Sequence, residues 1–207
     1  MTTFKWISAA IIIISLFYIS FIQTIAGWIN LLRKGQTVTL LPARGEGKWP
    51  LWTQIVLVIV LLPIFMLLMY FGWIPIFTLA PSTAFVISVI GLVIYLTGFI
   101  FVLWARHTLD RYWGISRDSQ VKLFDDHQLI QSGPYAFIRH PMYFGWWVAM
   151  VGLILVYPVW SVSLWLLLLL ISFFNRAQKE EAVLAERFGE IWTEYRKRTK
   201  FLIPFIY

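Results

Sequence analysis

The sequence predicts an all-α integral membrane protein with about five transmembrane helices, a cytoplasmic loop and an amphipathic C-terminal helix. The first observation is composition: 60% of the 207 residues are hydrophobic, 13% are charged, and the mean hydropathy is +0.76. These values lie outside the range of soluble domains. The second observation is that apolar runs of membrane-spanning length alternate with polar loops. The third is a long polar segment that leads into further apolar runs, which places polar chemistry at a membrane surface.

Residues 1–104 are expected to form three transmembrane helices, at about residues 6–32, 51–71 and 83–104. The loop at 33–48 is rich in Lys and Arg and poor in acids. The positive-inside rule therefore places this loop in the cytoplasm and the N-terminus outside. We expect a membrane of the bacterial inner-membrane type, with the active site on its cytoplasmic face.

The length of the first helix, a proline in the second and two glycines in the third each predict a structural feature. The first apolar run is longer than the core of a secretory signal, so we expect a retained helix. Pro63 should kink the second helix unless a neighbouring helix satisfies the freed carbonyl. Gly91 and Gly98 lie on one face of the third helix, where they favour close helix packing.

Residues 105–207 are expected to form the catalytic half, as part of a single structural unit with the first three helices. The stretch 105–140 is a mixed-charge cytoplasmic segment. Two apolar runs follow, at about 142–156 and 159–174, and each is shorter than the roughly 20 residues of a standard span. They predict a tight helical hairpin with its tip, Tyr157-Pro158, outside.

The segment from Asn175 to Lys200 predicts a helix that does not cross the membrane. One apolar stripe recurs at helical spacing. Its members are Leu184, Phe188, Ile191, Trp192 and Tyr195. Extending the stripe backwards by fours reaches Glu180 and then Arg176, which should both point at the protein. Buried charge is costly unless it is paired or binds something, so this pair is a candidate site. Gly189 is a candidate kink or helix end.

Arg139-His140-Pro141 stands immediately before an apolar run. Pro141 disfavours the α conformation at His140, so the chain should arrive extended and place proline in the first helical turn. The amides of that turn, including those of Met142 and Tyr143, lack intrahelical partners and attract a carboxylate or phosphate. From the residues alone, a plainer interpretation is favoured, in which Arg139 obeys the positive-inside rule and His140 is an ordinary interfacial histidine.

Composition and motifs exclude several function classes. The sequence has no cysteine, which removes disulfides, cysteine nucleophiles and thiolate metal sites. His107, His127 and His140 match no compact ligand spacing, so we expect no metal. The net charge of +7 reflects basic loops that flank apolar helices, and nucleic acid is not an expected partner. No phosphate-binding glycine loop or serine-nucleophile elbow occurs.

Separated motifs between Leu109 and Pro204 share one order and spacing with a known family. They are His127-Gln128-Leu129-Ile130, Ser132-Gly133-Pro134-Tyr135, Arg139-His140-Pro141-Met142-Tyr143-Phe144-Gly145, Lys179-Glu180-Glu181, Phe188-Gly189, Tyr195 and Ile203-Pro204. The set resembles the isoprenylcysteine carboxyl methyltransferase family, part of a wider group of membrane methyltransferases that includes phospholipid methyltransferases. One position departs from the family pattern: Asp110 replaces a glycine that is frequent there.

The resemblance implies methyl transfer from S-adenosylmethionine without a Rossmann domain. The implied cofactor-binding residues, with Arg139 added for its donors beside the helix start, are Gln120, His127, Gln128, Leu129, Ile130, Tyr135, Arg139, His140, Pro141, Met142, Tyr143 and Glu180. Arg176 matches an acceptor-side arginine, and the candidate catalytic residues are Arg176, Glu180 and His140. The residue chemistry agrees, because a helix N-terminus suits the cofactor's carboxylate and Glu180 suits its ammonium or ribose hydroxyls.

The acceptor is expected to be lipophilic, such as an isoprenylcysteine carboxylate or a lipidated molecule. Membrane lipids are expected to surround the protein. A phospholipid amine or a small thiol is the alternative within the enzyme class. Those acceptors must first lose a proton, for which His140 and Glu180 are the nearest bases. From another class, the alternative is a non-catalytic membrane protein whose basic face binds lipid or a partner.

Overall fold

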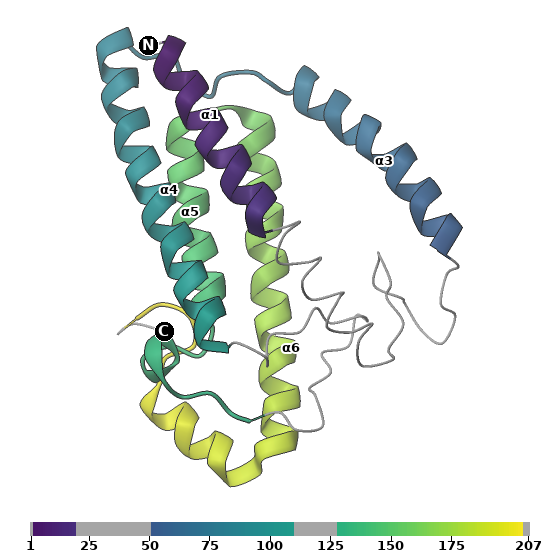
Figure 1. Cartoon of the computed structure of the whole chain (residues 1–207), viewed down its shortest axis with the longest axis vertical. Helices are drawn as coiled ribbons and strands as arrows, with labels where there is room; N and C mark the ends of the chain where they lie inside the picture. The colour runs from purple at the N-terminus through teal and green to yellow at the C-terminus, as the bar shows by residue number, and fades with distance from the viewer. Residues whose placement is uncertain (1, 20–50, 110–127, 205–207) are drawn as a thin grey trace. The chain divides into compact units, whose positions relative to one another are not determined.

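The computed structural model describes residues 2–19, 51–109 and 128–204. In this part of the chain, five α-helices and one short 3₁₀ helix form, and the only β-type pairing is two isolated bridges. The prediction of an all-α fold is therefore confirmed for the described residues. The chain divides into two compact units, the first containing α1 and α3 and the second containing α4, α5 and α6 (Figure 1).

The first unit contains two apolar helices, α1 (Thr2–Phe17) and α3 (Leu51–Phe71). The start of the predicted helix 6–32 lies in α1, while its part beyond residue 19 lies outside the described residues. Helix α3 coincides with the predicted span 51–71 and continues through Pro63 as one helix. Many of its apolar side chains are exposed, including Leu68 and Tyr70.

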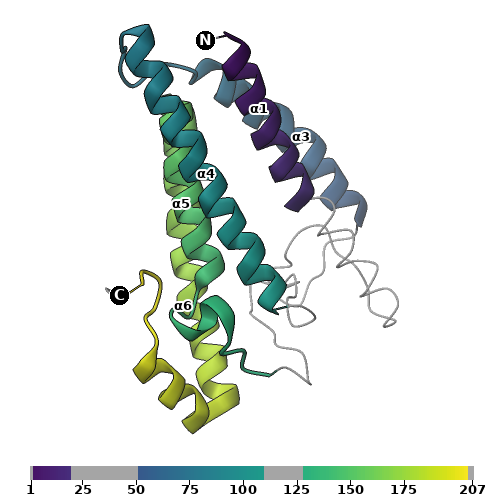
Figure 2. The same ribbon diagram turned by 60° about the vertical axis from the view of Figure 1, so that its left-hand side comes forward.

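The second unit is built on α4 (Pro81–Leu109), α5 (Pro141–Val156) and α6 (Trp160–Arg198). Helices α4 and α5 run side by side in opposite directions (Figure 2). A short turn joins α5 to α6, which packs next to α5. That turn is tied to the chain before α4. The amide of Ile76 donates to the carbonyl of Pro158 at 2.9 Å, and the amide of Trp160 donates to that of Ile74 at 3.0 Å.

Helix α6 differs from the prediction. The runs 159–174 and 175–200 were expected to be separate elements, but one helix runs unbroken through that boundary to Phe188, and a second helical stretch follows the kink at Gly189 to Arg198. The physical reason is that no proline or glycine interrupts the sequence between Trp160 and Phe188, so nothing stops the helix at the polar boundary. Helix α5, with 16 residues, is the short arm that the sequence predicted.

Within the described residues, α4 and α6 are long and apolar enough to cross a membrane, and three shorter apolar helices accompany them. Only 28% of the most apolar window of α4 and 17% of that of α6 is buried. Large apolar side chains such as Ile100, Leu164 and Leu168 are more than half exposed. An apolar surface of this extent is unstable in water, whereas lipid tails solvate it well.

Four glycines bring α4 and α5 into backbone contact. A Cβ atom at Gly98 would lie 2.3 Å from a main-chain nitrogen of α5, and one at Gly152 would lie 2.3 Å from a main-chain nitrogen of α4. At Gly91 and Gly145 the nearest atoms would be at 2.7 and 2.8 Å. The expected packing role of Gly91 and Gly98 is confirmed. Their counterparts on α5 were not recognised in the sequence, because pairing between helices has no local signal.

The glycine contact predicts a specific sensitivity. Gly98→Ala places a methyl group against the backbone of α5, and backbone cannot move aside without separating the helices. We expect a loss of roughly 1–3 kcal/mol in stability, the usual cost of overpacking, seen as a lower thermal unfolding temperature in detergent. Ile100→Ala, at a side chain 64% exposed on the same helix, is the matched control. Equal unfolding temperatures for the two variants would contradict the proposed contact.

Candidate functional site

The Ser-Gly-Pro-Tyr motif docks against the end of α4. Gly133 begins the 3₁₀ helix η3 (Gly133–Ala136) with a φ of +57°, and a Cβ atom there would lie 2.9 Å from the hydroxyl oxygen of Thr108. Only glycine suits both the positive φ and this close approach. Pro134 and Tyr135 are buried immediately after it. The motif therefore sets the path by which the chain reaches the start of α5.

The start of α5 has the conformation that proline imposes. His140 is the N-cap with φ −121° and ψ 59°, and Pro141 occupies the first helical turn. The amide of Phe144 donates to the carbonyl of His140 at 3.1 Å. No side chain caps this terminus within the described residues. Proline in the first helical turn is confirmed, whereas the expected extended conformation of His140 is not, because its ψ of 59° lies outside the extended region.

The end of the chain returns to this point. Gly189 has a φ of +51° inside α6 and bends the helix, so that its last turns swing back towards the start of α5 (Figure 1). We call Thr199–Leu202 the C-terminal strap. Its main chain pairs in parallel with the segment before α5: the amide of Arg139 donates to the carbonyl of Lys200 at 2.8 Å, and that of His140 to the carbonyl of Phe201 at 3.2 Å.

The predicted apolar stripe holds only in part. Trp192 and Tyr195 are buried, with 3% and 2% of their surface exposed, but Ile191 is 61% exposed. All three lie beyond Gly189 on one helical stretch, where Ile191 points about 100° away from Trp192. Ile191 therefore lies at the outer edge of the buried face.

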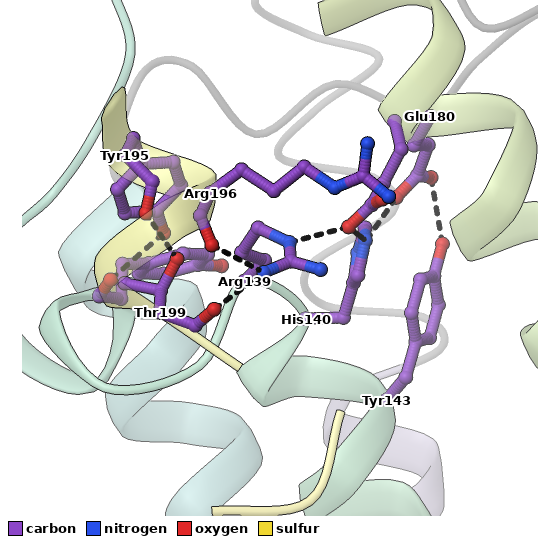
Figure 3. Close-up of polar contacts among 9 residues, drawn as sticks. Arg139, His140, Tyr143, Glu180, Tyr195, Arg196 and Thr199 are labelled. Carbon is purple, nitrogen blue, oxygen red and sulfur yellow. Dashed lines mark hydrogen bonds and ion pairs between the residues drawn. The ribbon is translucent and has the colours of Figure 1, made fainter. Parts of the chain in front are cut away.

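Glu180 is the centre of a polar cluster between α5 and α6 (Figure 3). The hydroxyl of Tyr143 donates to Oε1 of Glu180 at 2.6 Å, and Nε of Arg176 donates to the same oxygen at 3.1 Å. Nδ1 of His140 lies 3.6 Å from Oε2. The site thus joins one carboxylate to three groups that can donate to it.

The exposure of this cluster is uneven. The side chain of Glu180 is 23% exposed, but that of Arg176 is 43% exposed. The prediction that both point at the protein was therefore wrong for Arg176. Its long side chain runs along the helix surface to an ion pair one turn away, where the guanidinium keeps contact with solvent.

Glu181, which the sequence placed only within a motif, forms a second cluster. Nε of Arg139 donates to Oε1 of Glu181 at 2.5 Å, and Nε2 of His140 lies 3.5 Å from the same oxygen. The imidazole of His140 is 4% exposed and lies between the two adjacent carboxylates. The two distances from His140 to these carboxylates, 3.6 Å to Glu180 and 3.5 Å to Glu181, are longer than a good hydrogen bond. Nε2 has no hydrogen-bond partner among the described residues.

Further contacts fasten the end of α6 to this region. Nη1 of Arg139 donates to the carbonyl oxygens of Thr199 at 2.5 Å and Arg196 at 3.3 Å (Figure 3). The hydroxyl of Tyr195 donates to the carbonyl of Tyr135 at 2.7 Å. Burial raises the pKa of both the Tyr135 and the Tyr195 phenols. Tyr195 is therefore a protonated donor at neutral pH.

The charge state of Glu181 follows from competing effects. Burial alone would raise the pKa of its carboxyl group, but the hydrogen bond and positive charge of Arg139, with His140 close by, outweigh burial and lower that pKa. The carboxyl group is thus ionised at neutral pH and pairs with Arg139. This pairing orders the carboxylate beside Nε2 of His140.

The structure brings some of the predicted residues together and leaves others apart. Polar contacts join His140, Tyr143, Arg176 and Glu180 directly, and Arg139 reaches His140 through Glu181. The remaining candidates divide by burial: Tyr135 and Pro141 are buried, Leu129, Ile130 and Met142 are half-buried, and Gln128 is exposed. Gln120 and His127 lie outside the described residues.

Metal binding has no support in the same region. No group of histidine and acidic side chains in the described residues could hold a metal ion. His107 is exposed near the end of α4.

Residues 89–186 match the family model of the isoprenylcysteine carboxyl methyltransferase family. Over these residues, just under half of its length, the chain is similar to that family. The match begins in α4 and ends in α6, so it includes the glycine contact and both polar clusters.

Two curated relatives illustrate the similarity. Protein-S-isoprenylcysteine O-methyltransferase of Homo sapiens is 40% identical over 84 residues, which cover 40% of this chain and 29% of the human protein. The protein of the same name from Saccharomyces cerevisiae is 31% identical over 121 residues, covering 58% of this chain and 49% of the yeast protein. The chain thus spans less than half the length of these relatives.

A solved structure is also similar. It is described as the eukaryotic intramembrane Ras methyltransferase ICMT without a monobody. The TM-score is 0.49 at 26% sequence identity, and the superposition covers 74% of this chain and 53% of that chain.

The ionised state of Glu181 predicts a pH dependence of stability. Because its folded pKa is below the ordinary value of 4.5, the pairing contributes fully above about pH 4.5 and is lost as the pH falls through the folded pKa. We expect Glu181→Gln to lower the unfolding temperature at about pH 7 and to reduce its fall on acidification to about pH 4. Glu194→Gln, at a side chain 71% exposed, is the control. Parallel pH profiles for wild type and Glu181→Gln would contradict the assignment.

Proposed function

We propose that this chain is an integral membrane methyltransferase that uses S-adenosylmethionine and acts on a lipophilic acceptor such as an isoprenylcysteine carboxylate. The observation that carries the proposal is the cluster of His140, Tyr143, Arg176 and Glu180 within the segment that matches the family model. The relatives, named as isoprenylcysteine O-methyltransferases, supply the acceptor class. The lipid-compatible surfaces of α4 and α6 supply the membrane setting.

The residues present fit the chemistry of this cofactor. Its carboxylate suits the uncapped start of α5, where amides and the helix dipole favour an anion. Its ammonium or ribose hydroxyls suit the carboxylate of Glu180, which is 23% exposed and therefore reachable. Nε2 of His140 is buried without a hydrogen-bond partner among the described residues and could bond a ligand there. Buried polar atoms without a partner are the exception in folded proteins, which makes this atom a candidate contact for the ligand.

The remaining predicted cofactor contacts complete the proposed pocket. Tyr135, Pro141 and Met142 lie in or next to the segment that begins α5, and Leu129 and Ile130 are half-buried immediately before η3. Gln120, His127 and Gln128 belong to the same proposal through the family pattern. Tyr143 holds Glu180 in place through its short hydrogen bond.

Bound S-adenosylmethionine supplies an electrophilic methyl group on a sulfonium, which direct displacement transfers without a covalent enzyme intermediate. The chain's own residues then act by orientation. Arg176, half-exposed beside Glu180, holds an anionic acceptor in line, and the surrounding apolar helices exclude water. Positioning of this kind contributes up to roughly 7–11 kcal/mol in well-oriented systems. A carboxylate acceptor needs no general base.

The membrane orientation follows from charge. Basic residues on the loop after the first predicted span place it in the cytoplasm. The start of α5 and the end of α6 then lie on the cytoplasmic face, where the cofactor enters from the cytosol. A lipophilic or lipidated acceptor reaches the site from the membrane, between apolar helices. The proposed setting is an inner membrane of bacterial type.

The roles of Glu180 and Arg176 can be separated by variants. We expect wild type to bind S-adenosylmethionine with a dissociation constant in the micromolar range common to enzyme ligands, and Glu180→Ala to weaken binding by roughly tenfold or more through loss of a charged hydrogen bond. Arg176→Ala should keep the affinity within about threefold but abolish turnover. Calorimetry and methyl-transfer assays measure the two effects.

The control is Lys197→Ala, at a side chain 68% exposed on the distal part of α6, which should change neither quantity. Equal loss of affinity in the Arg176 and Glu180 variants would show that the division of roles is wrong. No binding heat from folded wild type would refute the proposed function.

The acceptor is identified by incubation with methyl-labelled cofactor and three acceptor classes: a prenylcysteine carboxylate, phosphatidylethanolamine and a small thiol. We expect label on the prenylcysteine, because the guanidinium of Arg176 attracts an anion and repels a protonated amine. Label on the amine or thiol alone would assign the chain to those reactions instead. Binding of lipid without any transfer would support the non-catalytic alternative.

A further inference from the structure

We propose that Arg139 is a positioning residue, which clamps Glu181 and the end of α6 around His140 and so orients His140 towards the cofactor. The effect on cofactor binding rests on the proposed function, whereas the clamp itself rests only on the contacts that Arg139 makes. It differs from the sequence-based expectation that Arg139 binds the cofactor directly. Three features of the structure support it.

The donors of Arg139 point into the protein. Nε donates to the carboxylate of Glu181, and Nη1 donates to the carbonyls of Thr199 and Arg196. The guanidinium carbon lies 5.8 Å from the centre of the Phe201 ring, and the side chain is 8% exposed. A planar fork is needed to serve a carboxylate on one edge and two carbonyls on another. The lysine ammonium cannot reproduce that arrangement.

The second feature is the end of a helix. Helix α6 ends at Arg198, and the last carbonyls of a helix lack partners within the helix. Arg139 donates to the carbonyl of Arg196 and to that of Thr199, the first residue beyond the helix. A positive charge at this end also complements the helix dipole. One side chain at the start of α5 therefore caps the end of α6.

The third feature is that both partners of Arg139 pack against His140. Oε1 of Glu181 lies 3.5 Å from Nε2 of His140, and the ring of Phe201 in the strap meets the imidazole edge-on at 5.0 Å between ring centres. Phe201 and Leu202 also form a buried cluster with Ala177, against which Tyr143 packs. Loss of Arg139 releases Glu181 and the strap together, and His140 loses both neighbours.

Positioning and direct binding predict different responses to substitution. If Arg139 bound the cofactor by its charge, lysine would largely replace it, and the effect would be independent of Glu181. If Arg139 acts as a clamp, substitution by lysine weakens cofactor binding almost as much as substitution by glutamine. The effect then also depends on Glu181, because residues that act through one another give non-additive changes.

The experiment compares Arg139→Lys, Arg139→Gln, Glu181→Gln and the double variant Arg139→Gln/Glu181→Gln, with Lys197→Gln as control. Affinity for S-adenosylmethionine is measured by calorimetry on protein shown to be folded in detergent. Hydrogen exchange is measured in the same samples for peptides covering 196–202. Arg139→Lys keeps the charge and most of the side-chain volume, and provides a folded variant where glutamine prevents folding.

We expect each single variant at Arg139 or Glu181 to weaken binding by roughly tenfold, and the double variant to be within about twofold of the weaker single variant. Exchange in the strap should rise at least about tenfold in both Arg139 variants. The control should match wild type in both measurements.

Wild-type affinity in Arg139→Lys combined with weak binding in Arg139→Gln would overturn the proposal in favour of direct binding. Additive losses in the double variant, or unchanged strap exchange in both Arg139 variants, would also overturn it. If folded wild type binds no cofactor, the proposed function fails. Strap exchange in the Arg139 variants then still decides whether Arg139 clamps the end of α6.

Discussion

The backbone contact between α4 and α5 is the constraint on which the rest of the second unit depends. Gly91 and Gly98 face Gly152 and Gly145 so closely that a single methyl group would overlap main-chain atoms. This contact fixes the register of the two helices, and it brings the start of α5 to the end of α4. Gly133 then fits against Thr108 at that same end. The position of His140 thus follows from packing contacts of glycines, which have no functional side chain.

The geometry of the start of α5 has local causes that the sequence reveals. Pro141 forces a non-helical His140 and begins the helix, and both features are present. The short helix after it and the role of Gly91 and Gly98 were also predicted from spacing. Such features depend on one or a few neighbouring residues, for which conformational preferences are strong. The Glu180 cluster was predicted in part, because helical spacing and the family pattern both singled out Arg176 and Glu180.

Features that depend on contacts between distant residues were not predictable. Glu181 received no role, since its partners Arg139 and His140 lie about forty residues earlier in the chain. The exposure of Arg176 was misjudged because its long charged side chain lies along the helix surface. The exposure of Ile191 was misjudged because its side chain points about 100° away from that of the buried Trp192. The strap pairing with the start of α5 had no sequence signal either. Its hydrogen bonds are main-chain bonds, which any residues can form.

The geometry of α6 explains why the adjacent residues Glu180 and Glu181 have different partners. On a straight helix, neighbouring side chains point about 100° apart, so Glu180 faces Tyr143 and Arg176 while Glu181 faces Arg139. His140 fits between the two carboxylates. The bend at Gly189 then returns the helix end to Arg139, which closes a loop of contacts through Glu181, Arg139 and the strap. The polar cluster around His140 gains its order from this closed set of contacts.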